Sequence, residues 1–213
     1  MARDGWSMVI PLGVVMVVCL VLMRWSESPL LVPLAGVSGL GSVMMGLFFR
    51  DPERTIPEGD GLILSAADGK VVAIQELDDE PFVGGRAVQI SVFLSLLNVH
   101  VNRMPLPGIV RSRQYIKGRF LLAHKRTASQ QNEQIVLGVE SPYGRVVVKQ
   151  IVGFLARRIV CRVQEGQSVQ AGERIGLIRF GSRVDVIVPI HATITARVGM
   201  TVRGGETILG VLR

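Results

Sequence analysis

The chain has 213 residues, a length that fits one ordinary domain with a modest additional element rather than several domains. Its hydrophobic share is 48%, and the apolar excess is concentrated in the first 49 residues, which argues against a wholly soluble protein. The formal net charge of +7 suits an anionic lipid surface better than nucleic acid, because no Lys/Arg-rich helix or aromatic-interleaved basic strand is visible.

Two uncharged stretches open the chain, at residues 5–23 and 28–49. Each is close to the roughly 20 residues that a helix needs to cross the apolar core of a bilayer. Trp6 and Trp25 lie near the ends of the first stretch, where indole rings favour the membrane interface. The pattern predicts a helical membrane hairpin over residues 1–49. A spanning hairpin and one that dips into a single leaflet both fit, whereas a cleaved signal peptide does not.

The arginines around the hairpin give its expected orientation. Arg3 precedes it, Arg50 and Arg54 follow it, and Arg24 alone lies in the turn. Because positively charged residues favour the cytoplasmic side, we expect both termini and the remaining domain on the cytoplasmic side of the cell membrane.

After residue 49 the sequence changes to short Val- and Ile-rich runs between glycines, which is typical of β-strands. We therefore predict a mainly β fold with an N-terminal α-helical membrane hairpin, divided into a membrane-anchoring element, 1–49, and a β-rich domain, 50–213. A helix is expected only at 120–129. The expected strands are 62–64, 70–74, 87–93, 135–139, 146–152, 159–163, 175–179 and 184–188.

The C-terminal part contains an internal repeat. Residues 165–176 and 198–209 share a G-x-x-V-x-x-G-E-x-I pattern at an offset of 33 residues, with two tight turns around a short strand in each copy. Such a pair is typical of the two halves of a barrel-sandwich of the biotinyl/lipoyl-like type. A carrier domain of that type presents a lysine between its halves, but here the dipeptide Gly181-Ser182 occupies the region.

A Gly-Ser pair is chemically suited to a rearrangement of the backbone. Glycine tolerates strained dihedral angles and leaves its carbonyl open, so the next hydroxyl can attack it and convert the amide into an ester. Loss of the serine Cα proton then expels the carboxylate and leaves dehydroalanine, which hydrolyses to a pyruvoyl group and ammonia. A base must activate the hydroxyl for this reaction. Without further context, however, Gly-Ser is usually a turn.

Six sequence boxes supply that context, and together they resemble the pyruvoyl-dependent phosphatidylserine decarboxylase proenzymes of the short form. The resemblance runs in order from about residue 49 to about residue 190. The boxes are FRDPER at 49–54, SAADGKV at 65–71, FLSLLNVHVNRMP at 93–105, NE at 132–133, QIVGFLARRIV at 150–160 and FGSRVD at 180–185.

The resemblance implies a self-cleaving enzyme. The chain would split between Gly181 and Ser182 into a β chain, 1–181, and an α chain, 182–213, which stay together as a heterodimer; further oligomerisation is left open. Ser182 would become the pyruvoyl cofactor, with no metal and no pyridoxal phosphate. Its carbonyl would form a Schiff base with phosphatidylserine in an anionic membrane and yield phosphatidylethanolamine.

By the same resemblance, Asp68 and His100 are the acid/base partners of Ser182 in self-cleavage, with the aspartate orienting the imidazole. The longer members of the family carry a second histidine where this chain has Arg103. This chain would therefore either use His100 for both self-cleavage and decarboxylation or recruit another group, for which His124 and His191 are the alternatives. Asn98 also departs from the usual aspartate, which could weaken the tuning of the histidine.

Three arginines, Arg103, Arg157 and Arg158, are candidates for binding the lipid phosphate or the substrate carboxylate, because guanidinium groups bind such anions bidentately. An ordinary ion-paired role is the alternative for each. The three histidines have no ligand spacing and the two cysteines form no framework, so no metal site is expected.

Two rival functions fit parts of the sequence. A non-enzymatic membrane adaptor with a barrel-sandwich module would explain the hairpin and the repeat, but not the family-like positions of Asp68, His100 and Gly181-Ser182. A membrane serine hydrolase would use the same serine, but no G-x-S-x-G elbow surrounds it.

Overall fold

The structure, a computed structural model, describes residues 1–123, 127–154, 158–179 and 181–213. It divides into two compact units, Met1–Pro52 and Glu53–Arg213, and each is described by itself. The division falls a few residues after the boundary predicted from the sequence, inside the charged exit that follows the hairpin.

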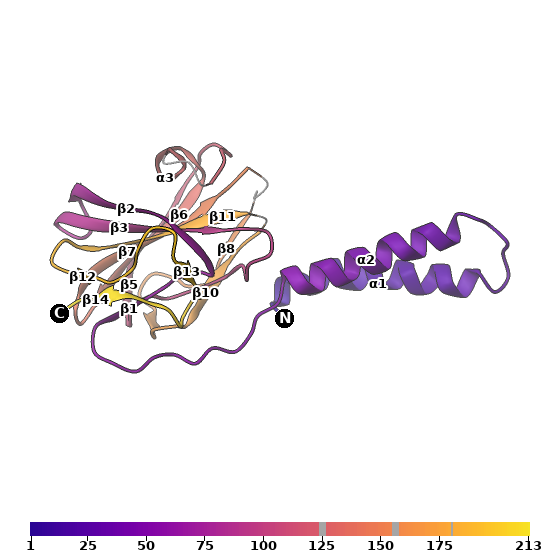
Figure 1. Cartoon of the computed structure of the whole chain (residues 1–213), viewed down its shortest axis with the longest axis horizontal. Helices are drawn as coiled ribbons and strands as arrows, with labels where there is room; N and C mark the ends of the chain where they lie inside the picture. Colours follow the sequence, from indigo (N-terminus) through magenta and orange to yellow (C-terminus); the bar gives the residue numbers. More distant parts are fainter. Residues whose placement is uncertain (124–126, 155–157, 180) are drawn as a thin grey trace. The chain divides into compact units, whose positions relative to one another are not determined.

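The first unit is a pair of helices, α1 (Arg3–Leu22) and α2 (Leu31–Phe48), which lie side by side (Figure 1). At about 1.5 Å per residue they are roughly 30 and 27 Å long, close to the apolar thickness of a bilayer. Both are long and apolar enough to cross a membrane. Ser42 of α2 donates a hydrogen bond to the carbonyl of Val9 in α1 (3.2 Å), so a polar contact joins the two helices. The predicted helical hairpin is confirmed.

The second unit is built from short strands and one short helix, α3 (Ala128–Gln131). The strands are β1 (Leu62–Leu64), β2 (Gly69–Glu80), β3 (Gly85–Leu94), β4 (Val101–Arg103), β5 (Gly108–Ile116), β6 (Gln134–Ser141), β7 (Gly144–Val152), β8 (Ile159–Cys161), β9 (Ser168–Val169), β10 (Arg174–Ile178), β11 (Ser182–Pro189), β12 (Thr193–Ile194), β13 (Thr201–Val202) and β14 (Ile208–Val211).

Eight of these strands form one curled sheet in the order β13-β2-β3-β11-β7-β6-β5-β9 (Figure 1). Two three-stranded sheets, β1-β14-β12 and β4-β10-β8, complete the unit. β11 lies inside the large sheet and pairs with β3 on one side and β7 on the other. Because side chains alternate along a strand, Val184 and Val186 face the main apolar core, while Arg183 and Asp185 face the opposite side of the sheet. The mainly β prediction is confirmed.

The repeat brings the two edges of the large sheet together. β9 and β13 are equivalent positions of the two copies and form its opposite ends. Gly172 and Gly205 also correspond, and both have left-handed backbone, with φ of +74° and +78°. A Cβ added to Gly205 would lie 3.6 Å from the Cα of Gly172, and Ile56 packs against both glycines. The turns of the two copies therefore meet around Ile56 and close the curled sheet, as expected for a barrel-sandwich.

Two expectations about local structure were wrong or incomplete. The helix expected at 120–129 is absent at 120–123, and only α3 is helical nearby; part of the expected range lies outside the described residues. Asn132 explains the difference, because its side chain bonds both the N–H and the carbonyl of Leu121 and holds that segment out of a helix. β5 was missed because its outer half carries exposed polar side chains instead of an apolar run.

Candidate active site

Ser182 is the first residue of β11 and lies between two neighbouring strands. It stands opposite Leu94 at the end of β3 and Val152 at the end of β7. The residue is fully buried, and its hydroxyl has no hydrogen-bond partner among the described residues. A buried hydroxyl without a hydrogen-bond partner lowers the stability of the folded protein. A protein that keeps such a group commonly uses it for chemistry. Ser182 therefore offers an uncommitted nucleophile inside the sheet.

Gly181 makes the turn into β11 in the left-handed region, with a φ of +65°, where side chains are disfavoured. Its own Cα faces open space, since an added Cβ would meet nothing within 4 Å. Its carbonyl, by contrast, packs closely against Gly153: a Cβ at Gly153 would overlap this oxygen. The carbonyl of the Gly181–Ser182 peptide bond is thus held by backbone packing on one side, in a turn that favours glycine.

His100 is the ionisable side chain beside this bond. It is 2% exposed, and its Nδ1 lies 2.8 Å from the carbonyl oxygen of Asn98, which requires Nδ1 to carry the proton. Its Nε2 accepts a long hydrogen bond of 3.4 Å from the N–H of Gly181. Both contacts are consistent with one neutral tautomer, whose Nε2 lone pair faces the Gly181–Ser182 segment. Such a nitrogen can act as a general base.

The sequence suggested that the side chain at position 98 tunes the histidine, whereas in the structure the Asn98 side chain bonds Ser95. Its Oδ1 accepts hydrogen bonds from the N–H and the hydroxyl of Ser95, at 2.9 and 2.7 Å. This contact shapes the turn after β3, while the backbone carbonyl of Asn98 orients the imidazole. An amide oxygen accepts both bonds as an aspartate would, so the substitution leaves this local geometry intact.

Asp68 lies just before β2, at the same end of the large sheet as Ser182. Both its carboxylate oxygens accept bonds from Arg54, at 3.0 and 2.8 Å, and Oδ1 also accepts the N–H of Gly204. Arg54 bonds Glu206 as well, at 3.2 Å. The strand pairings put Asp68 two strands from Ser182, or roughly 10 Å. The structure thus brings His100 to the N–H of Gly181, while Asp68 lies in an ion-paired cluster at the same edge.

The three candidate arginines differ in their surroundings. Arg103 is 6% exposed, and its guanidinium donates to the carbonyl of Gly172 at 3.0 Å. Arg158 is exposed, and its carbonyl accepts the N–H of Arg179 at 3.1 Å. Arg157 lies outside the described residues. Of the two arginines that are described, Arg158 is therefore the one accessible to a bound anion.

Asn132 is a site residue whose role the sequence did not indicate. Its amide donates to the carbonyls of Leu121 and Val152, both at 2.8 Å, and its Oδ1 accepts the N–H of Leu121 at 3.0 Å. Val152 is the strand partner of Ser182, so Asn132 ties the site to the segment that follows β5. Its neighbour Glu133 accepts a hydrogen bond from Tyr115, which raises the pKa of that phenol. The NE box was the signal that could have identified Asn132.

A buried ion pair directly follows Ser182. Arg183 donates to both oxygens of Asp185, at 2.6 and 3.2 Å, and also to the hydroxyl of Ser91. Ser129 in α3 donates to the same carboxylate at 2.6 Å. Both charged side chains are at most 1% exposed. The sequence carries a signal for this ion pair: Arg183 and Asp185 are opposite charges at positions i and i+2 of an otherwise apolar run. Side chains at i and i+2 of a strand lie on the same face, so the two can pair.

A pocket of about 250 Å³ opens beside the Gly-Ser bond. Gly181 forms part of its wall, and most of the remaining wall is apolar, including Leu96, Leu122 and Phe154. Within the described ranges, no group of three or more His, Cys, Asp or Glu side chains could hold a metal ion. The site combines a hydroxyl without a hydrogen-bond partner among the described residues, a preceding glycine in the left-handed region and an imidazole that contacts the N–H of this glycine. These residues fit a prosthetic group made from Ser182 itself.

Comparison with known proteins agrees with this geometry. The family model of phosphatidylserine decarboxylase matches residues 43–210. The phosphatidylserine decarboxylase proenzyme of Ehrlichia chaffeensis is 48% identical over 174 residues, covering 81% of this chain and 77% of that protein. The proenzyme of Symbiobacterium thermophilum is 42% identical over 218 residues, covering 99% and 95%. That of Chlorobium phaeobacteroides is 43% identical over 183 residues, covering 85% and 86%. The chain belongs to the phosphatidylserine decarboxylase family.

Proposed function

We propose that this chain is a zymogen that cuts itself between Gly181 and Ser182 and then decarboxylates phosphatidylserine to phosphatidylethanolamine. Membership of the family supports the decarboxylation, and the word proenzyme in the names of the relatives supports a processed precursor. The observation that carries the proposal is the buried hydroxyl of Ser182, which has no hydrogen-bond partner among the described residues and follows a left-handed Gly181 whose N–H is bonded to the Nε2 of His100.

Self-cleavage begins at the Ser182 hydroxyl. His100 takes the hydroxyl proton on Nε2, and Oγ attacks the Gly181 carbonyl carbon, so that the amide becomes an ester and the amine of Ser182 is released. Removal of the Cα proton of Ser182 then breaks the bond between Cβ and the ester oxygen, and Gly181 leaves as a carboxylate. The dehydroalanine left at position 182 takes up water and loses ammonia, which gives the pyruvoyl group.

The pyruvoyl carbonyl condenses with the substrate amine and accepts the electron pair when carbon dioxide leaves. The chain's own residues supply the rest. We assign His100 to both self-cleavage and decarboxylation, because its Nε2 contacts the N–H of Gly181 and can exchange a proton there. Arg158 is exposed and can bind an anionic group of the lipid, while the same role for Arg157 and for the buried Arg103 stays a prediction.

Asp68 remains our proposed partner of His100 at the same sheet edge. Because Arg54 and Gly204 hold its carboxylate, a direct bond to the imidazole would require Asp68 to leave that ion pair. In the present arrangement Asp68 instead fixes the segment before β2, and with it the neighbouring strand end.

The processed protein would consist of the β chain, 1–181, and the α chain, 182–213, held together by the pairing of β11 with β3 and β7. The hairpin would hold it at the cell membrane with the catalytic unit on the cytoplasmic side, where a diacyl substrate can reach the site from the bilayer.

Denaturing electrophoresis of the purified full chain tests self-cleavage. We expect two fragments with a blocked N-terminus at residue 182, a single uncut band of 23.2 kDa for Ser182→Ala, and strongly slowed processing for His100→Ala. His191→Ala is the matched control, because this exposed histidine lies at the far end of β11 and should leave processing unchanged. An uncut wild-type chain would contradict the proposal and favour the adaptor alternative.

Activity needs its own measurement. Cleaved protein mixed with phosphatidylserine should release carbon dioxide, and borohydride should attach the lipid to the small chain. Release of carbon dioxide without any adduct on residues 182–213 would contradict the assignment of Ser182 as the cofactor.

A further inference from the structure

Large apolar side chains are exposed on the loops that surround the Gly181 pocket. Leu97 is 83% exposed and Leu96 47%, in the turn after β3; Leu122 is 46% and Phe154 63% exposed, in the segments after β5 and β7. Single exposed apolar residues are common, but four on adjoining loops form a patch that usually marks an interaction surface.

The pocket joins these loops into one surface. Leu96, Leu122 and Phe154 all line it together with Gly181, although they come from three separate segments of the chain. Three of the four exposed side chains therefore line the same cavity as Gly181, and Leu97 directly follows one of them. A ligand that covered the patch would lie directly against the site.

The charges on these segments indicate what covers the patch. Residues 93–103, 117–132 and 153–164 contain no Asp or Glu. The one cation of the first segment, Arg103, is buried, so the exposed cations come from the other two segments. Lys117, Arg119 and Arg158 are exposed among them. Exposed apolar tips with a cationic surround are typical of surfaces that insert into an anionic lipid interface, because the apolar groups enter the acyl boundary while the cations meet acidic head groups.

We propose that the patch of Leu96, Leu97, Leu122 and Phe154 inserts into the surface of an anionic bilayer, as a second membrane contact in addition to the hairpin. With the function proposed above, the patch opens the site toward the membrane, so that the lipid substrate enters the pocket from the bilayer and stays surrounded by apolar groups. The hairpin then anchors the chain, while the patch sets which end of the catalytic unit meets the lipid.

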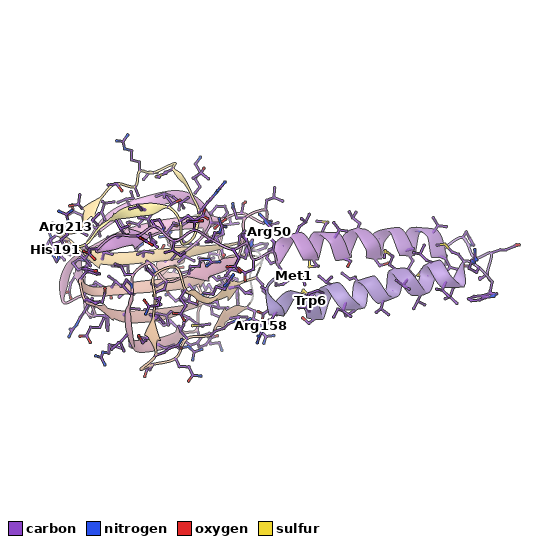
Figure 2. The ribbon with its side chains drawn as sticks, turned by 90° about the horizontal axis from the view of Figure 1, so that it is seen from below. Met1, Trp6, Arg50, Arg158, His191 and Arg213 are labelled. Carbon is purple, nitrogen blue, oxygen red and sulfur yellow. The ribbon has the colours of Figure 1, made fainter. Side chains whose placement is uncertain are left out.

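The far end of the catalytic unit provides a matched control position. Figure 2 shows Arg158 and His191 at opposite ends of this unit. Ser182 begins β11 and His191 follows its end, so about eight strand residues, or roughly 26 Å, separate the two ends. His191 is exposed, as Leu97 is, and a label at either position should leave the core undisturbed.

The test uses the full chain with Cys19 and Cys161 replaced by alanine and a single new cysteine from Leu97→Cys or His191→Cys. Each protein is labelled with an environment-sensitive dye and reconstituted into phosphatidylcholine vesicles with or without phosphatidylglycerol, which is anionic but is no substrate. We expect the dye at position 97 to be quenched several-fold more by spin-labelled acyl chains than the dye at position 191, and several-fold less by aqueous iodide. The difference should grow with phosphatidylglycerol.

No turnover is needed in this measurement, so it can fail or succeed independently of the proposed function. Equal iodide access at positions 97 and 191 in anionic vesicles would overturn the inference, and equal insertion into neutral vesicles would overturn its electrostatic part. As a second readout, Leu97→Asp should lower kcat/KM on vesicle-borne phosphatidylserine roughly tenfold, against no loss for His191→Asp. Wild-type kcat/KM for Leu97→Asp on vesicles would also contradict the inference.

Discussion

Gly153→Ala is the substitution that bears most directly on the proposed cleavage between Gly181 and Ser182. The methyl group would overlap the carbonyl oxygen of Gly181, and the added carbon would also lie 3.1 Å from the Cβ of Ala123. An ordinary carbon–oxygen contact is about 3.3–3.6 Å, so the carbonyl has to move by about 1 Å. A misplacement of about 1 Å at a reacting group costs roughly 10²-fold in rate. We therefore expect self-cleavage about a hundred times slower than in the wild type.

The same overlap also strains the fold, at a cost of about 1–3 kcal/mol, so a control must separate strain from chemistry. Gly210→Ala supplies it, because a Cβ there would overlap the carbonyl of Thr193 in the β12–β14 pair in the same manner. Cleavage is followed on denaturing gels after synthesis, and stability by urea unfolding of chains that also carry Ser182→Ala. Wild-type cleavage in Gly153→Ala, or equal slowing in Gly210→Ala, would refute the reasoning.

Three further substitutions test the contacts around the site. Asn132→Ala removes three hydrogen bonds from a buried amide and should lower the free energy of unfolding by about 2–4 kcal/mol in urea titration; a loss below 1 kcal/mol would contradict the role given to this side chain. Asp185→Ala leaves Arg183 buried without its carboxylate and should lower the free energy of unfolding by about 3–5 kcal/mol. Arg183→Met combined with Asp185→Leu should lower it by less, and urea unfolding of both variants checks this difference. Arg54→Leu should destabilise by a similar amount because Asp68 is only 14% exposed, and little change in the thermal midpoint would speak against a structural ion pair.

Several of the predicted strands have apolar runs that are buried on both faces, as in β3 and β7. β11 is one of these, and its eight residues are all buried, so its composition alone identifies it. β5 was not predicted because residues 113–116 are exposed, which leaves no apolar run in the sequence. The two-residue strands β9 and β13 could not be found as strands, yet the repeat identified both turns around them, since equivalent glycines adopt equivalent left-handed backbone.

The sequence indicated the candidate reacting residues, but it did not indicate the contacts that support them. The Gly-Ser pair and His100 were predicted from motif order, and the structure puts the N–H of Gly181 in contact with the imidazole. The orientation of the imidazole could not be foreseen, because the backbone carbonyl of Asn98 supplies it and any residue type has a carbonyl. The position of Gly153 against the scissile carbonyl likewise depends on two strand ends meeting in space. Such contacts are set by tertiary packing and leave no local periodicity to read.

The place of β11 inside the large sheet gives the proposed cut an unusual thermodynamic meaning. The small chain would keep the strand that joins β3 to β7, together with β12, β13 and β14. Before cleavage β11 pairs with β3 and β7 within a single chain, so folding is independent of protein concentration. After cleavage, any denatured pair would have to reunite by collision, and recovery would become second order and fade on dilution. The precursor would thus fold once under favourable conditions, and the mature protein would depend on never fully unfolding.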